Sequence, residues 1–194
     1  MNENYISLVA VISNDADILP DRVRRLDQVL REHFKYYEFV FVDNHSGDDS
    51  LEVLKSLDMK CTVVELAQRH KLPQAVMAGI DAAIGDYVFE IEDLSVELDF
   101  NLLIDMYETC QQGNDFVFLT PRDSSAMSRV FYRLLNGRLR YPAGQEVTSS
   151  VCILSSRRAQ NKVAAMGDYI LNRNVAYAYA GLKCAYLKTD MVYR

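Results

Sequence analysis

The sequence has 194 residues, of which 49% are apolar and 25% charged, as is ordinary for one globular domain. The formal net charge of −6 excludes a strongly basic surface, so we expect no nucleic-acid partner. No stretch approaches the ~20 apolar residues of a membrane span, and the first residues lack the positive region of a signal peptide. We therefore expect a cytoplasmic protein that forms one domain over 1–194 and can meet a membrane through a partner.

The first part of the chain alternates strand and helix patterns. Apolar, β-branched runs predict strands at 6–12, 38–42, 61–66, 87–91 and 116–119. Apolar residues at helical spacing predict helices at 23–30, 51–57, 75–83 and 102–107. This repeated order predicts an α/β fold with a mostly parallel sheet and right-handed crossovers.

After Pro121 the pattern is less regular, and we interpret it as an extension of the same sheet. The expected elements are a helix at 127–136, a loop at 137–150, a strand at 151–154, helices at 157–166 and 168–173, and a strand at 183–187. Several tyrosines near the end, at 177, 179, 186 and 193, fit either an interface such as a homodimer or a core and half-exposed strand face.

Two local features of the predicted helices make simple predictions. Small residues such as Gly79 should let the helix at 75–83 lie close to the sheet, and Gly85 should cap its end. The arginines of the first helix lie mostly opposite its apolar side, so we expect them, Arg22 included, on a solvated face.

Polar side chains follow three of the predicted strands. They are Asn14 and Asp15 after the first strand, Asp43 and Asn44 after the second, and Glu90, Glu92 and Asp93 around the end of the fourth. Because parallel strands end at one edge of a sheet, these groups should converge, where ligands of open α/β sheets bind. They could hold Mg²⁺ or Mn²⁺, or Asp43 could accept hydrogen bonds from a base or sugar. The alternative is that they are helix caps and solvated acids.

A basic loop, Arg69-His70-Lys71, precedes the third predicted helix and could face a diphosphate. Three arginines further on, at 122, 129 and 133, could do the same from another side. For each of these residues the alternative is a solvated or ion-paired surface position.

Three stretches, Ser7–Asp15, Phe41–Asp48 and Ala75–Asp86, together resemble family 2 glycosyltransferases in their order and spacing. A fourth, Phe131–Asn136, is similar to the polyprenyl-phosphate glycosyltransferase branch, which includes dolichyl-phosphate mannose synthase. The resemblance implies a GT-A fold, a three-layer α/β/α sandwich that binds a nucleotide-diphospho-sugar. It also implies transfer of the sugar from a UDP- or GDP-sugar to an acceptor, such as a lipid phosphate or a growing surface glycan.

The resemblance also suggests which residues bind. Nucleotide-binding positions of the family fall on Asn14, Asp15, Asp43, Asn44 and Ser46. The family's metal-binding D-x-D falls near Glu92 and Asp93, which would hold Mg²⁺ or Mn²⁺, while Arg69, His70 and Lys71 would face the diphosphate. No residue is assigned a catalytic role.

The chain also departs from the family pattern. Only one carboxylate of the D-x-D stays in register, and the stretch Thr148–Leu154 has no acid where this branch usually has a second one. The family's acceptor-side Gly-Ser-Lys-Tyr segment and membrane helices would come after Arg194, outside this sequence.

Three functions are therefore compared. The first is a glycosyltransferase of the hexosyltransferase type. The second is a catalytically degenerate GT-A module that acts as partner or regulatory subunit of an active, membrane-associated transferase. The third is a nucleotidyltransferase, against which the lack of a Gly-rich basic loop after the first strand counts.

Overall fold

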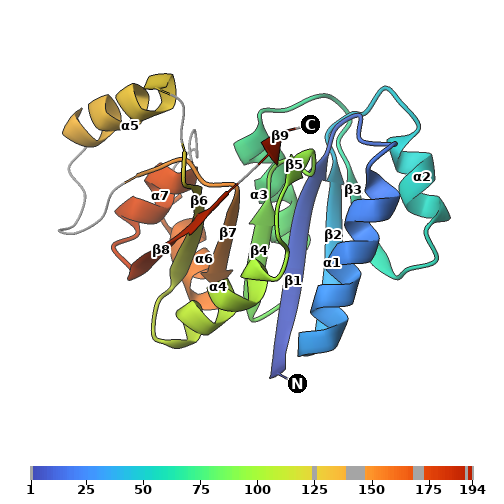
Figure 1. Ribbon diagram of the computed structural model, residues 1–194, viewed down its shortest axis with the longest axis horizontal. Coiled ribbons are helices and arrows are strands. Elements are labelled where there is room, and N and C mark those ends of the chain that lie inside the picture. The colour runs from blue at the N-terminus through green and yellow to red at the C-terminus, as the bar shows by residue number, and fades with distance from the viewer. Residues whose placement is uncertain (1, 124–125, 139–146, 168–172, 191, 194) are drawn as a thin grey trace.

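The computed structural model describes residues 2–123, 126–138, 147–167, 173–190 and 192–193. A seven-stranded sheet with strand order β3-β2-β1-β4-β7-β6-β8 forms its centre (Figure 1). Its strands are β1 (Asn2–Ile12), β2 (Phe34–Asp43), β3 (Cys61–Glu65), β4 (Tyr87–Ile91), β6 (Phe116–Pro121), β7 (Cys152–Ser156) and β8 (Cys184–Thr189). A separate two-stranded ladder joins β5 (Val96–Glu97) to β9 (Val192–Tyr193).

The sheet is mostly parallel, which confirms the predicted fold class. β1 runs parallel to β2 and β4, β2 to β3, and β6 to β8. β7 is the exception in this sheet, because it lies antiparallel between β4 and β6. The carboxyl ends of the parallel strands and the amino end of β7 therefore share one edge of the sheet, which we call the functional edge.

Helices cover both faces of the sheet (Figure 1). Buried residues of α1 (Leu19–His33), α2 (Ser50–Ser56) and α4 (Leu102–Gln111) pack in a cluster on one face. Those of α3 (Leu72–Ala82), α6 (Arg157–Ala165) and α7 (Arg173–Tyr179) pack on the other. The remaining helix, α5 (Ala126–Arg138), lies outside both layers. No helix of the described residues has the length and apolar character to cross a membrane.

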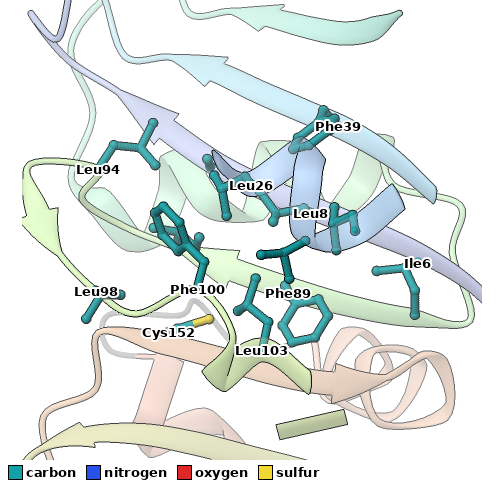
Figure 2. Packing of buried hydrophobic residues seen from close by; sticks show 14 of the residues in the cluster. Ile6, Leu8, Leu26, Phe39, Phe89, Leu94, Leu98, Phe100, Leu103 and Cys152 are labelled. Atoms are coloured by element: carbon teal, nitrogen blue, oxygen red, sulfur yellow. The ribbon is translucent and has the colours of Figure 1, made fainter. Parts of the chain in front are cut away.

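The larger core cluster also anchors the segment that follows β4. Figure 2 shows Leu94, Leu98 and Phe100 at one end of this cluster, which also contains Leu8 and Phe89 of the sheet. The three side chains of this segment are at most 4% exposed. Burial of Leu94 anchors the backbone directly after the acids Glu92 and Asp93. Because successive side chains of an extended chain point to opposite sides, the neighbour Asp93 points away from the core.

Gly79 makes close packing of α3 on the sheet possible, as the sequence predicts. A Cβ atom at this position would overlap Val9 Cγ1 and would lie 2.7 Å from Val42 Cγ2. Gly85 does not cap α3, because the C-cap residue is Ala83. A Cβ atom on Gly85 would instead lie 2.6 Å from the backbone nitrogen of Ser7, so this glycine allows a close backbone approach.

Three other expectations need correction or completion. Arg22 is buried rather than solvated, and its Nε donates to the backbone oxygen of Leu94 at 3.1 Å. The short β5–β9 ladder carries no predictive pattern, because two-residue strands are too short for periodicity. The helix expected at 168–173 lies mostly outside the described residues, and α7 begins at Arg173.

The contact of α3 with the sheet leads to a prediction. Gly79→Ala should destabilise the protein by about 1–3 kcal/mol, because the added methyl group overpacks the contact with Val9 and Val42. The matched control is Gly137→Ala in α5, where a Cβ atom meets nothing within 4 Å. This control should be neutral or gain up to about 1 kcal/mol from helix propensity. Urea unfolding of both variants measures the difference, and equal midpoints would contradict this packing role.

Candidate functional site

A hollow of about 720 Å³ lies at the functional edge, beyond β1, β2 and β4 and against the start of α3. We call it the strand-end hollow. Most of its lining residues are polar or charged, and they come from four loops that are far apart in the sequence. The lining includes Asn14, Asp15, Asn44, Arg69, His70, Lys71, Glu92 and Asp93. The structure thus brings together most of the site residues that the sequence predicts.

The loops after β1 and β2 are joined by side-chain hydrogen bonds. Asn14 Oδ1 accepts from the backbone nitrogen of Gly47 at 2.7 Å, and the backbone nitrogen of Asn14 donates to Ser46 Oγ at 3.2 Å. The backbone nitrogen of Asp15 donates to Ser50 Oγ at 2.7 Å. Asn14 and His45 have φ angles of 62° and 60°, a region that residues other than glycine seldom occupy. Such conformations persist where surrounding contacts enforce them, as at many binding sites.

Asp43 organises this loop from behind the hollow. Its side chain is 6% exposed, and Oδ1 accepts from the backbone nitrogen of Ser46 at 3.2 Å and from Ser46 Oγ at 2.5 Å. Neither Asp43 nor Ser46 is among the lining residues. In this structure they hold the loop in shape, while Asn14, Asp15 and Asn44 face the hollow.

Asn44 connects the loop after β2 to the basic loop before α3. Its Oδ1 accepts from the backbone nitrogen of His70 at 2.8 Å, and its Nδ2 donates to the backbone oxygen of His70 at 3.0 Å. The buried amide thus fixes the backbone of the basic loop with two hydrogen bonds. The side chains of Arg69, His70 and Lys71 are exposed and border the hollow.

The acids after β4 occupy the opposite wall. Glu92 is partly buried, and Asp93 is exposed with its Oδ1 accepting from the backbone nitrogen of Ser95 at 2.8 Å. Burial of Leu94 in the core holds both acids at the rim. A basic wall and an acidic wall therefore face one hollow.

A buried arginine connects Glu90 and Glu92, at the end of β4, to the far half of the sheet. Arg173 Nη1 lies 2.7 Å from Glu90 Oε2, and Arg173 Nη2 lies 2.8 Å from Glu92 Oε1. The side chains of Arg173 and Glu90 are 2% and 0% exposed. Two carboxylates thus share one guanidinium, and we call these residues the buried ion cluster.

Neutral donors complete the surroundings of Glu90. Tyr177 Oη and Gln160 Nε2 donate to Glu90 Oε1 at 2.7 Å and 2.8 Å. Burial raises the pKa of the Glu90 carboxyl, and the guanidinium of Arg173 opposes this shift. We assign an ionised pair, because a buried arginine without an anion would be far more costly than the paired arrangement.

The charge of the hollow also acts on Asp15. Burial raises the pKa of its carboxyl, a hydrogen bond from the backbone of Ser13 opposes the shift, and Asp93 and Asp48 raise it further by repulsion. The acidic neighbours of Asp15 therefore add to the effect of burial. A bound cation would relieve this repulsion.

A second, smaller hollow lies at the same edge beneath α5. It measures about 360 Å³ and lies between α5, the ends of β6 and β8, and the segment before β7. Three cations, Arg129, Arg133 and Lys188, contribute to its lining. Tyr132 also lines it, and burial together with the charge of Glu92 raises the pKa of this tyrosine. We call this cavity the α5 hollow.

The acids fit a metal only with help from a ligand. Among the residues that the structure describes, no three His, Cys, Asp or Glu side chains form a metal-binding group. Glu92 and Asp93 each keep one carboxylate oxygen without a hydrogen bond or ion pair in the described structure. Mg²⁺ is commonly held by one or two carboxylates together with substrate phosphates and water. The residues present therefore fit a cation shared with a phosphate group.

The sequence model of the family described as glycosyl transferase family 2 matches residues 7–168 of the chain. The chain belongs to this family. The match spans both loops of the strand-end hollow, the basic loop and the acids after β4. It confirms the family that the motifs at 7–15, 41–48 and 75–86 indicate.

Curated relatives of this glycosyltransferase family 2 chain include two bacterial transferases. YkcC of Bacillus subtilis, an uncharacterized glycosyltransferase, is 26% identical over 141 residues, which are 68% of this chain and 43% of YkcC. The undecaprenyl-phosphate 4-deoxy-4-formamido-L-arabinose transferase of Edwardsiella ictaluri is 27% identical over 161 residues, 80% of this chain and 49% of the relative. The chain thus spans less than half the length of either, and the second confirms the resemblance to polyprenyl-phosphate glycosyltransferases.

Solved structures of sugar transferases share the fold. Glucosyl-3-phosphoglycerate synthase from Mycobacterium tuberculosis, in complex with Mn²⁺ and UDP-glucose, superposes with a TM-score of 0.69 at 14% identity, over 98% of this chain and 71% of that chain. Mannosyltransferase PcManGT from Pyrobaculum calidifontis, in complex with GDP-mannose and Mn²⁺, gives 0.67 at 16% identity, over 97% and 56%. These matches confirm the GT-A-like α/β/α sandwich of the family 2 chain.

The sequence does not identify the cation that pairs with Glu90 and Glu92 at the end of β4. Glu90 interrupts an apolar strand, which signals a buried charge that needs a cation. Which of the 21 lysines and arginines supplies it depends on the tertiary fold. Arg173, 83 positions further on, has no local pattern that marks it.

The buried ion cluster leads to a second prediction. Arg173→Met should cost about 3–5 kcal/mol of stability, because it leaves the buried Glu90 carboxylate without its counter-charge. Lys55→Met is the matched control, since the Lys55–Glu65 pair is about half exposed and should contribute only about 0–1 kcal/mol. Denaturant unfolding at neutral pH compares the two, and a small loss in both would show that the cluster is not a major source of stability.

Proposed function

We propose that this family 2 chain is the donor-binding part of a glycosyltransferase and binds a UDP- or GDP-sugar in the strand-end hollow. The observation that carries the proposal is the convergence of Asn14, Asp15 and Asn44 with a basic and an acidic wall in one hollow. In open α/β sheets such a hollow beyond the strand ends is where nucleotides bind. The names of the matched relatives and structures supply the sugar-transfer class.

In this proposal each part of the hollow has one task. Asp15 accepts hydrogen bonds from the base or ribose, beside the loop that Asp43 and Ser46 organise. Asn44 acts through the basic loop, whose backbone it holds with two hydrogen bonds to His70. Arg69, His70 and Lys71 face the diphosphate, where positive charge stabilises the leaving group as negative charge develops. Glu92 and Asp93 would hold Mg²⁺ or Mn²⁺, which would neutralise part of the same charge.

The acceptor belongs to the α5 hollow in this account. Its three cations suit an anionic acceptor such as a lipid phosphate, and phosphate recognition by arginine is favoured by paired hydrogen bonds. Burial and, to a smaller extent, the charge of Glu92 raise the pKa of Tyr132, so the acidic wall of the strand-end hollow acts on a residue of the α5 hollow. No side chain is assigned as the general base, because the described residues directly before β7, 147–151, include hydroxyl groups and no acid.

That missing acid favours a second candidate function, a donor-binding module without turnover that serves an active transferase as partner. Ser150 Oγ receives a hydrogen bond from Asn174 Nδ2 at 3.1 Å, and Nδ2 of the same side chain donates to the backbone oxygen of Thr148. These contacts fix the segment structurally and supply no base. The two candidates differ in turnover and agree in donor binding.

Calorimetric titration of the full chain with UDP- and GDP-sugars, with and without Mn²⁺, tests the proposal. We expect binding of one nucleotide class, strengthened by the metal. Asp15→Asn should weaken it at least about tenfold through a lost charged hydrogen bond. Asp81→Asn, at an exposed position on α3, is the control and should bind as wild type. If neither nucleotide class binds, donor binding is wrong; binding without any sugar hydrolysis or transfer would favour the partner module.

Stability separates loss of binding from loss of fold in this test. The pKa of Asp15 is raised by burial, so the folded state binds a proton more readily than the unfolded state. Wild-type stability should therefore gain from Asp15 as the pH falls through the raised pKa. At pH 7 the neutral Asp15→Asn variant should be at least as stable as wild type, whereas a lower midpoint would invalidate it as a binding probe.

A further inference from the structure

The segment that follows the acidic wall is attached to a buried arginine of α1. Arg22 lies near the start of α1, and its side chain is 1% exposed. Its Nε donates to the backbone oxygen of Leu94 at 3.1 Å. Leu94 directly follows Asp93 and packs in the same core cluster as Leu26 of α1 (Figure 2). Arg22 therefore holds the backbone one residue beyond the acidic wall of the strand-end hollow.

Ion pairing does not explain why Arg22 is buried. Its Nη1 lies 3.5 Å from Glu97 Oε1 and 3.9 Å from Asp21 Oδ2, and these acidic side chains are 34% and 61% exposed. Glu97 also pairs with Arg25, whose Nη1 lies closer to it, at 3.3 Å. Among the described residues, Nη2 of Arg22 has no hydrogen-bond partner although it is buried. The shortest hydrogen bond of this side chain goes to a backbone oxygen, which does not neutralise the charge, so the burial of Arg22 needs another explanation.

The peptide group between Leu94 and Ser95 links Arg22 to Asp93. Its oxygen accepts from Arg22 Nε, and its N–H, which belongs to Ser95, donates to Asp93 Oδ1 at 2.8 Å. Because a peptide group is planar, it cannot turn without disturbing both hydrogen bonds. Hydrogen bonds in such a chain also polarise and strengthen one another. Arg22 therefore restricts the orientation of the Asp93 carboxylate, whose Oδ2 has no hydrogen bond or ion pair in the described structure.

We propose that Arg22 is a positioning residue for Asp93. Through the peptide group between Leu94 and Ser95 it fixes the carboxylate so that Oδ2 stays available to a divalent cation. The inference rests on the proposed function, in which the acidic wall holds Mg²⁺ or Mn²⁺. The other acid of this wall, Glu92, is held by Arg173 of α7. Each acid thus depends on its own buried arginine, and the helices that carry these arginines pack on opposite faces of the sheet.

The first test needs no ligand. In NMR measurements of amide exchange on the full chain, Arg22→Met should speed exchange of the Ser95 amide at least about threefold, because the peptide group loses the hydrogen bond that holds it. Should this variant not fold, Arg22→Lys, which keeps the buried charge and lacks Nε, replaces it with the same expectation.

The matched control is Arg25→Met. Arg25 lies three residues further along α1 and also pairs with Glu97, but its backbone contact is the oxygen of Leu98. This control should leave exchange of the Ser95 amide at the wild-type rate. The proposal is overturned if the Arg22 variant leaves that rate unchanged, or if Arg25→Met raises it as much.

The second test separates positioning of Asp93 from a general structural role. In calorimetric titration with UDP-glucose or GDP-mannose, whichever the wild type binds, Mn²⁺ should strengthen binding. Arg22→Met should reduce this gain in affinity at least about threefold. Asp93→Asn should reduce the gain as well, and adding Arg22→Met to it should change nothing further, because both changes act on one carboxylate.

Two results of this titration would overturn the proposal. One is an equal loss of affinity in Arg22→Met with and without Mn²⁺, and the other is additive losses in the variant that combines it with Asp93→Asn. A wild type that binds neither nucleotide sugar, or gains nothing from Mn²⁺, contradicts the proposed function and the cation-binding part of this inference. Exchange of the Ser95 amide then still decides whether Arg22 orients Asp93.

Discussion

The contact on which the candidate site most depends is the buried ion pair of Glu90 and Arg173. Glu90 lies on the inner strand β4, and Arg173 begins α7 on the far half of the sheet. A charge in the middle of a strand is tolerated only with a counter-charge and further hydrogen bonds, which Tyr177 and Gln160 donate. The second bond of the guanidinium, to Glu92, transfers this rigidity to the wall of the strand-end hollow.

Binding and chemistry are separated in this structure. The parallel sheet brings the loops after β1, β2 and β4 to one edge, and hydrogen bonds of Asn14 and Asn44 hold those loops before any ligand arrives. Such preorganisation lowers the cost of binding. The described residues 148–150, before β7, carry hydroxyl groups, which cannot act as a base at neutral pH without a partner to activate them. The geometry therefore favours donor binding, whereas only family membership supports turnover.

The sequence predicts the sheet and most of the site because both depend on local signals. Apolar runs that end in polar clusters predict β1, β2 and β4, and the parallel order predicts that residues such as Asp15 and Asn44 converge. Arg173, the burial of Arg22 and the retreat of Asp43 behind its loop depend on tertiary neighbours. Two-residue strands such as β5 and β9 are too short to give a sequence pattern. The apolar residues of α5 have the spacing of an ordinary core helix, so the sequence does not show that they are exposed.

Hydrogen–deuterium exchange with and without a nucleotide sugar would locate the donor most directly. The account predicts that a UDP- or GDP-sugar slows exchange of backbone amides at 13–15, 44–47 and 69–71, the loops of the strand-end hollow. Amides at the opposite edge, around Asp86 and Asp115, should exchange at the same rate in both states. Protection confined to that opposite edge, or no protection anywhere at saturating nucleotide sugar, would contradict the account.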